Sequence, residues 1–161
     1  MAELPVNLTA LPIEAWLLSW LADDPGVRAV VSGRVYPVMV PAEQSLPAVV
    51  ASRSGTTREY SLRGQSESVA ATFQIECWAK STAEGYLANC RAARAVVLAL
   101  SGVRGDFPDG AGGIYAIERV AVQDERDAAE VSEFADEAQY FSRQLVVQVQ
   151  YLEPVRNPVG G

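Results

Sequence analysis

The feature that most constrains the fold is an alternation of apolar and polar side chains in two segments, residues 69–79 and 141–151. Successive side chains of a β-strand point to opposite faces, so each segment predicts a strand with one buried face. The apolar positions are Val69, Ala71, Phe73, Ile75, Cys77 and Ala79 in the first segment, and Phe141, Leu145, Val147, Val149 and Tyr151 in the second.

Two other segments, residues 11–26 and 81–102, repeat apolar residues at helical spacing. In the second, Ser81 stands three residues before Glu84, the spacing of a capping box. The sequence therefore predicts an α+β protein, an antiparallel-rich sheet of about five strands with two amphipathic helices packed on one face. The predicted helical stripes are Ile13, Trp16, Leu17, Trp20 and Leu21, and Tyr86, Cys90, Ala93, Val97 and Leu100.

The segments after the first helix predict shorter elements. Residues 27–33 read as a short apolar turn, and residues 34–36 as a brief strand that stops at a proline. A longer strand starts near residue 48, is interrupted by a bulge near Gly55, and continues as an exposed hairpin arm that reaches Tyr60.

Glycine and proline mark the remaining connections. Residues 64–68 predict a polar turn, residues 103–113 a mobile loop, and residues 114–123 a further strand. We expect a single domain over residues 13–152, an N-terminal extension over 1–12 and a flexible C-terminal tail over 153–161.

The charge balance limits the classes of partner. The chain carries 20 acidic and 13 basic residues, a formal charge of −7. Proteins that grip DNA usually present a basic stripe, so this composition argues against stable DNA binding. The start of the chain lacks the pattern of a signal peptide, and no run reaches the roughly 20 apolar residues of a membrane span. We expect a soluble protein, made in a cytoplasm, with no membrane partner.

Common catalytic and metal sites are excluded by composition. The chain has no histidine, so Ser-His-Asp, Cys-His and histidine metal sites cannot form. Cys77 and Cys90 are too few for a structural zinc site. The glycine-rich segment matches no phosphate-binding motif, and its Arg104-Gly105-Asp106 tripeptide has no secretion signal to give it meaning. We expect no catalytic residue, no cofactor and no metal.

The most charged segment, QDERDAAEVSEFADEAQYF, spans residues 123–141. It lacks the glycine and the ligand spacing of a calcium loop, and a hydrolase pair of carboxylates needs a pocket that a linear string does not show. A solvated connection between two strands is the plain interpretation. The length of the segment and its apolar residues Val131, Phe134, Tyr140 and Phe141 favour a surface that a neighbour orders.

Several short motifs occur in an order that resembles a known family. They are GRVYP at residues 33–37, LPAVVASRSG at 46–55, TFQIECWA at 72–79, the capped helix from Ser81, and QDERD at 123–127 before the final strand. This succession, over residues 13–152, resembles the tail completion, or tail terminator, family of long-tailed bacteriophages. The glycine-rich loop at 104–113 and the tail at 153–161 match no motif of that family.

The resemblance implies a small α+β subunit of a hexameric ring at the head-proximal end of a phage tail. In that family the ring stops polymerisation of the tail tube and joins the tail to the head connector, while DNA passes through its lumen without specific binding. The implied partners are further copies of the chain, the tail-tube protein and a head connector or stopper protein. The implied location is the neck of the virion, after assembly in the host bacterial cytoplasm, and no catalytic residue is implied.

Arginine suits carboxylates at interfaces, so the arginines of the arm are candidate partners for the acidic segment of the next subunit. A head-side adaptor or stopper of the neck is the alternative function, and a carboxylate-dependent hydrolase that uses Asp124 and Asp127 is a remote one. The candidate interface residues are Arg53, Arg58, Tyr60, Arg63, Asp124, Glu125, Arg126, Asp127, Glu130 and Phe134.

Overall fold

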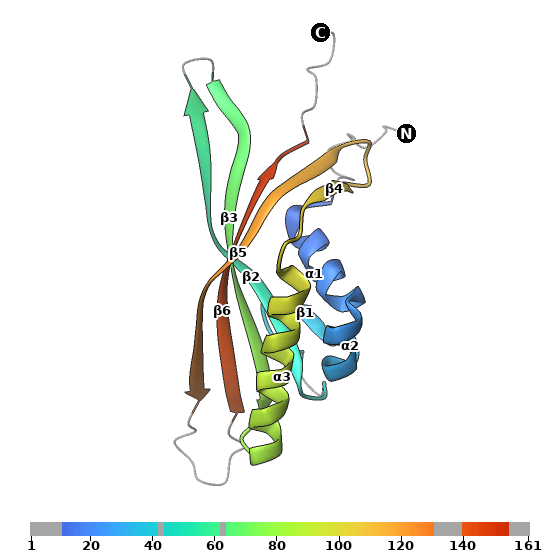
Figure 1. The fold of residues 1–161 in the computed structure, drawn as a ribbon, viewed down its shortest axis with the longest axis vertical. Coiled ribbons are helices and arrows are strands. Elements are labelled where there is room, and N and C mark those ends of the chain that lie inside the picture. The colour runs from blue at the N-terminus through green and yellow to red at the C-terminus, as the bar shows by residue number, and fades with distance from the viewer. Residues whose placement is uncertain (1–10, 42–43, 62–63, 131–139, 155–161) are drawn as a thin grey trace, which may run out of the picture.

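The computed structural model describes residues 11–41, 44–61, 64–130 and 140–154, which form one curled sheet with helices on one face (Figure 1). The predicted α+β class is confirmed, but the described chain has six strands and three helices, one more of each than expected. The elements are α1 (Ile13–Asp23), α2 (Pro25–Val31), β1 (Val35–Pro37), β2 (Ala48–Ser61), β3 (Gly64–Lys80), α3 (Ala83–Leu100), β4 (Gly105–Pro108), β5 (Ile114–Glu130) and β6 (Tyr140–Leu152).

The strand order across the sheet is β1-β2-β3-β6-β5-β4. Strand β1 pairs with β2 in parallel, and the other neighbours in this order are antiparallel. Figure 1 shows β2 and β3 extending together at one end of the sheet, and β5 and β6 extending together at the other. All three helices lie on one side, so the opposite face of the sheet carries no described helix.

The two alternating segments form the neighbouring strands β3 and β6, and their buried faces build the core. Every predicted apolar position of β3 is buried, and so are four of the five in β6, where only Phe141 is half-buried. Ile13, Leu17 and Leu21 of α1 are buried against this layer. Burial of each large apolar side chain contributes about 1.5–3 kcal/mol. The buried faces of the two alternating strands therefore supply much of the stabilisation of the fold.

Helix α2 occupies a segment that the sequence predicted as a turn, and that prediction is wrong. The carboxylate of Asp24 accepts a hydrogen bond from the backbone N–H of Val27 (3.0 Å), and Pro25 fills the first helical position, where a missing N–H has no cost. Val27 and Val31 are fully buried. The Asp-Pro pair that ends α1 therefore also starts a second helix.

Helix α3 is confirmed, but its cap and its buried stripe differ from the predicted ones. Thr82, rather than Ser81, caps the helix by accepting a hydrogen bond from the N–H of Gly85 (2.9 Å). Tyr86, predicted on the buried stripe, is exposed. Alanine at two buried positions lets α3 lie close to its neighbours, and the buried set is Asn89, Ala92, Ala93, Val96 and Leu100.

The glycine-rich segment predicted as a mobile loop contains the edge strand β4, so that prediction is wrong. Strand β4 pairs with the start of β5, with Phe107 opposite Tyr115. The ring of Phe107 packs against Trp16 and Trp20 of α1, with centroid distances of 5.4 Å to each. Aromatic packing therefore ties this edge of the sheet to the helical layer.

The turn from β4 to β5 is closed by Asp109, which is buried. Its carboxylate accepts hydrogen bonds from the N–H groups of Ala111 and Gly113, each at 2.8 Å. A side chain at Gly113 would overlap the Asp109 carboxylate and Pro154, so the turn requires glycine there.

The arm is a two-stranded hairpin. Residues 64–68, predicted as a turn, belong to β3, because their backbone continues the ladder with β2, where Tyr60 lies opposite Gln65. The predicted bulge is confirmed by a register shift between Arg53 and Gly55. Such a bulge bends and twists the arm.

Candidate assembly surfaces

The first part of the acidic segment, residues 123–130, belongs to β5. Asp124, Glu125, Arg126, Asp127 and Glu130 belong to β5 and pair with the first half of β6, so the predicted connection between two strands is too long. Acidic residues are depleted in strands, but pairing with a strongly alternating partner overrides that preference. Phe134, the remaining candidate of this segment, lies outside the described residues.

Asp127 is held by an arginine on the neighbouring strand. Arg143 Nε donates to Asp127 Oδ1 (2.6 Å), and Arg143 Nη1 lies 3.4 Å from Glu125 Oε1. The hydroxyl of Tyr86 donates to Asp127 Oδ2 (3.0 Å), which ties α3 to this hairpin. The amide of Asn89 completes the contact in the orientation where it donates to the Cys77 carbonyl (2.6 Å) and accepts from the Arg143 N–H (3.3 Å).

These contacts shift the ionisation of the carboxylates. The hydrogen bond from Arg143 holds the pKa of Asp127 below its usual range. The hydrogen bond from Arg126, whose Nη2 lies 2.7 Å from Asp124 Oδ2, lowers the pKa of Asp124 in the same way. Both carboxylates are therefore ionised at neutral pH, and each is matched by one arginine of its own chain.

Asp124 and Asp127 cannot flank one scissile bond. Along β5 they are three residues apart without an intervening bulge, and they pair with Val146 and Arg143 of β6, so they point to opposite faces of the sheet. A hydrolase pair needs both carboxylates beside one substrate atom. This geometry removes the observation on which the hydrolase hypothesis depended.

The arginines of the arm also have partners within the chain. Arg53 Nη2 lies 2.5 Å from Glu14 Oε1 of α1, and Arg58 Nη1 lies 2.6 Å from Glu153 Oε2. Tyr60 is placed on β2 near the tip of the arm, and Arg63 lies outside the described residues. The structure thus places Arg53 and Arg58 on β2, where they pair with Glu14 and Glu153 rather than with the acidic segment of β5.

The face of the sheet away from the helices is largely polar, as the alternation predicted. Along β3 and β6 its residues are mostly neutral hydrogen-bonding groups, half-buried between neighbouring strands, and β5 adds the exposed Arg119, Asp124 and Arg126. The register aligns Thr72 with Gln148, Gln74 with Val146, and Glu76 with Gln144.

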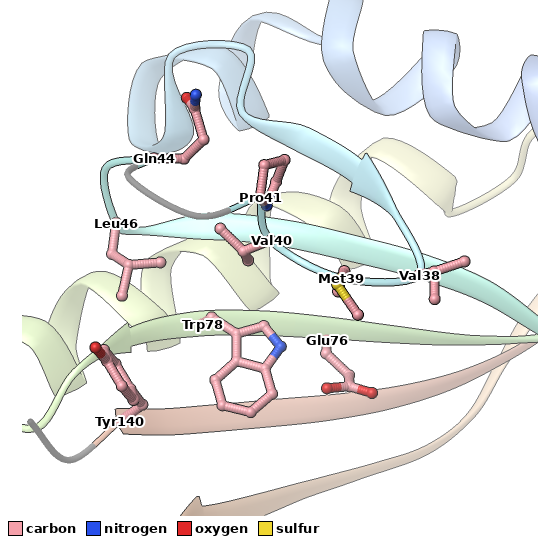
Figure 2. Close-up of a pocket in the computed structure, with 9 residues that line it drawn as sticks. All are labelled: Val38, Met39, Val40, Pro41, Gln44, Leu46, Glu76, Trp78 and Tyr140. Atoms are coloured by element: carbon pink, nitrogen blue, oxygen red, sulfur yellow. The ribbon is translucent and has the colours of Figure 1, made fainter.

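This face is hollowed where the loop after β1 crosses it (Figure 2). The hollow has a volume of about 370 Å³. Val38 and Met39, which line it from the loop, are 71% and 68% exposed. Figure 2 shows Trp78 and Glu76 of β3 across the hollow from Met39 and Val40. An apolar side chain of a partner, next to a basic group, would match the apolar lining of the hollow and the carboxylate of Glu76.

The sequence patterns do not indicate this hollow, because residues 38–46 lie between the two predicted strands and carry neither a helical nor a strand repeat. A signal was present in the run Val38-Met39-Val40 between two prolines, since loops rarely carry three consecutive large apolar residues. The backbone of Val38 lies in the left-handed region, with φ of 68°. A β-branched residue there is strained.

In the part of the chain that the structure describes, no three histidine, cysteine, aspartate or glutamate side chains gather where they could hold a metal ion. Nor does any helix in the described ranges have the length and apolarity needed to cross a membrane. Burial raises the pKa of the Cys77 thiol to about 12, so that thiol stays protonated.

The fold and these surfaces define a two-layer α+β protein with one open sheet face and charged hairpins at both ends. The sequence model of the family described as "Tail completion protein gp17" matches residues 15–136, so the chain belongs to that family. It is therefore a structural protein of a bacteriophage tail, as the motifs predicted. No curated protein matches the chain.

A solved structure has the same fold. A chain of the "Virion of native gene transfer agent (GTA) particle" superimposes with a TM-score of 0.61 at 20% sequence identity. The match covers 84% of this chain and 91% of that one. At this identity the likeness concerns the fold, and it extends over nearly all of both chains.

Proposed function

We propose that the chain assembles into a ring that caps the head-proximal end of the tail tube, ends tube elongation and joins the tail to the head connector. The observation that carries this proposal is the open sheet, which has different surfaces at its two ends. Family membership supports a location in the phage tail, and the geometry of the sheet suits contacts that close a ring.

A ring of identical subunits needs two different, complementary surfaces on each subunit, related by a rotation that closes. The arm of β2 and β3 and the acidic hairpin of β5 and β6 extend in opposite directions (Figure 1). The first carries Arg53 and Arg58, and the second carries four carboxylates between Asp124 and Glu130. These are the surfaces that we propose meet between neighbours, with a hexamer as the expected ring.

The charge of the chain suits a channel for DNA. The formal charge is −7, and along β3 and β6 the open sheet face presents mainly glutamine and threonine. Its basic residues are Lys80, Arg119 and Arg126, of which Arg126 is paired with Asp124 on the same face. A lumen of this kind repels phosphate weakly and binds none of it firmly. DNA would therefore pass through the ring without being held.

The test is coexpression of the tagged chain with the tail-tube protein, and separately with the portal and adaptor proteins of the same phage. We expect capture of the tail-tube protein, and tubes that are capped at one end. Capture of portal or adaptor proteins in its place would show that the ring is a head-side adaptor or stopper, and the tail-side proposal would fail.

A salt series gives an independent check on the ring itself. Exposed ion pairs are screened above roughly 0.1 M salt, so we expect the oligomer to weaken as sodium chloride rises from about 50 to 500 mM. Sedimentation velocity measures this directly. A ring that is indifferent to salt would mean that the charged hairpins do not carry the contact.

A further inference from the structure

Strands β2 and β5 each have one covered and one open half-edge. Strand β1 covers β2 at Val49–Ala51, and β4 covers β5 at residues 114–117. Over residues 52–61, β2 pairs only with β3 within the described ranges, and over residues 118–130 β5 pairs only with β6. The two open half-edges lie on opposite sides of the sheet and toward its opposite ends (Figure 1).

An open edge presents backbone N–H and C=O groups that can hydrogen-bond to a further strand. Because β2, β3, β6 and β5 alternate in direction, β2 runs opposite to β5. A rotation about an axis along the strands preserves these directions. In a ring, β2 of one subunit would therefore meet β5 of the next in the antiparallel orientation, which is the more stable ladder.

We infer that the open half of β2 in one subunit pairs with the open half of β5 in the next, so that the sheets join into one closed barrel around the ring. The inference rests on the proposed ring and adds which backbone segments make its contact. Closure removes both open edges.

The covered halves do not obstruct this pairing. Since β1 and β4 lie at opposite ends of the sheet, each stays clear of the neighbour when the open halves are brought level. Bringing them level shifts each subunit along its strands. Such a shift produces a strand tilt, and closed barrels have tilts of roughly 35–45°.

Bulges and charges on the two half-edges restrict the pairing to a specific partner. The longest regular runs between the bulges of the two open half-edges are residues 55–58 of β2 and 124–130 of β5. The first run ends in Arg58 and the second is acidic. Opposite charges on facing strands stabilise a ladder, and a charged, bulged edge disfavours pairing with unrelated strands.

Disulfide trapping tests this pairing. Thr57 lies on the polar face of β2, and the register places Ala121, Asp124 and Arg126 of β5 on that same face. Thr57→Cys is combined in turn with Ala121→Cys, Asp124→Cys and Arg126→Cys, in a Cys90→Ser background that removes the half-exposed native thiol. Within one subunit these strands are about three strand spacings, roughly 14 Å, apart, too far for a disulfide.

We expect one of these three variants to form intersubunit disulfides in more than half of its chains after mild oxidation, seen as a ladder on a non-reducing gel. The matched control is Thr57→Cys with Glu125→Cys. Glu125 is exposed, as are its neighbours Asp124 and Arg126, but it points to the opposite face. This control should cross-link in fewer than a tenth of its chains.

The failure of this inference is distinguishable from failure of the ring. Rings seen by sedimentation for all variants, with no ladder from any of the three, would overturn the strand pairing and leave the ring standing. Equal cross-linking by the Glu125→Cys control would also overturn it, since an ordered ladder separates the two faces. Absence of an oligomer in the unmodified chain would overturn both proposals.

Discussion

Val38 holds a backbone conformation that its side chain disfavours. Its φ is 68°, and its side chain is 71% exposed, so little burial offsets the strain. We expect Val38→Gly to raise the free energy of unfolding by about 0.5–1 kcal/mol, because glycine adopts this region without steric cost. Urea denaturation measures the change.

Met39 provides the matched control for this substitution. It is equally exposed, at 68%, and its φ is not positive. Met39→Gly should lower the free energy of unfolding by about 0.5–1 kcal/mol, through the entropy of the unfolded chain. A loss of stability in both variants would show that Val38 is not strained.

The ionised carboxylate of Asp127 contributes to the free energy of unfolding. Its pKa is held low by Arg143, so its contribution is present above the unfolded value of about 3.9 and is lost as pH falls through the lower folded value. We expect Asp127→Asn to cost about 0.5–1 kcal/mol at pH 7, a magnitude limited by its exposure. At pH 3 the difference from the unmodified chain should shrink.

Chemical denaturation at both pH values checks this expectation, with Asp106→Asn on the exposed edge of β4 as a control for the change of charge. A cost for Asp127→Asn that is the same at pH 7 and pH 3 would contradict the role of its ionised form. The pairing of Asp127 with Arg143 could not be predicted from sequence, because it depends on the register between two strands.

At the scale of the elements, the contact of β4 with α1 can be tested through Phe107. We expect Phe107→Ala to lower the free energy of unfolding by about 2–3 kcal/mol, since a half-buried aromatic ring is lost. The fluorescence of Trp16 and Trp20, which pack on this ring, should shift to longer wavelength.

Ile114→Ala, at a side chain that is 53% exposed, controls for truncation at the start of β5 and should cost less than about 1 kcal/mol. If Phe107→Ala leaves both stability and fluorescence unchanged, β4 is not packed as described, and the loop that the sequence predicted is the better account of this segment.

Whether a helix or strand could be predicted depends on how local its sequence determinants are. Strands β3 and β6 and helices α1 and α3 could be predicted, because their periodicity is written into consecutive residues. Helix α2 was missed because Asp24-Pro25 suits both the end of one helix and the start of another. Strand β4 was missed because its glycines and proline outweigh Phe107, whose partners lie on α1.

The candidate surfaces divide in the same way. The charge of the acidic segment is plain from sequence, but its position on β5 depends on pairing with β6. Arg53 and Arg58 were predicted as partners of a neighbour, and each has an ion pair within its own chain. Their role between subunits stays a prediction. The hollow beside Trp78 required a loop to cross the sheet, which no local pattern indicates.

At the scale of the whole molecule, helices cover one face of the sheet, while the open half-edges of β2 and β5 can pair with further strands. A closed ring would cover both edges and leave the polar face toward its lumen. The tail-tube protein and the head connector would then meet the two ends of the ring, where the hairpins extend (Figure 1).

Electron microscopy of the purified chain, alone and mixed with its tail-tube protein, tests the proposed ring most directly. We expect ring-shaped particles with a central channel wide enough for duplex DNA, found at one end only of each tube. Monomers in both samples, together with tubes that lack a ring at either end, would contradict the proposed ring.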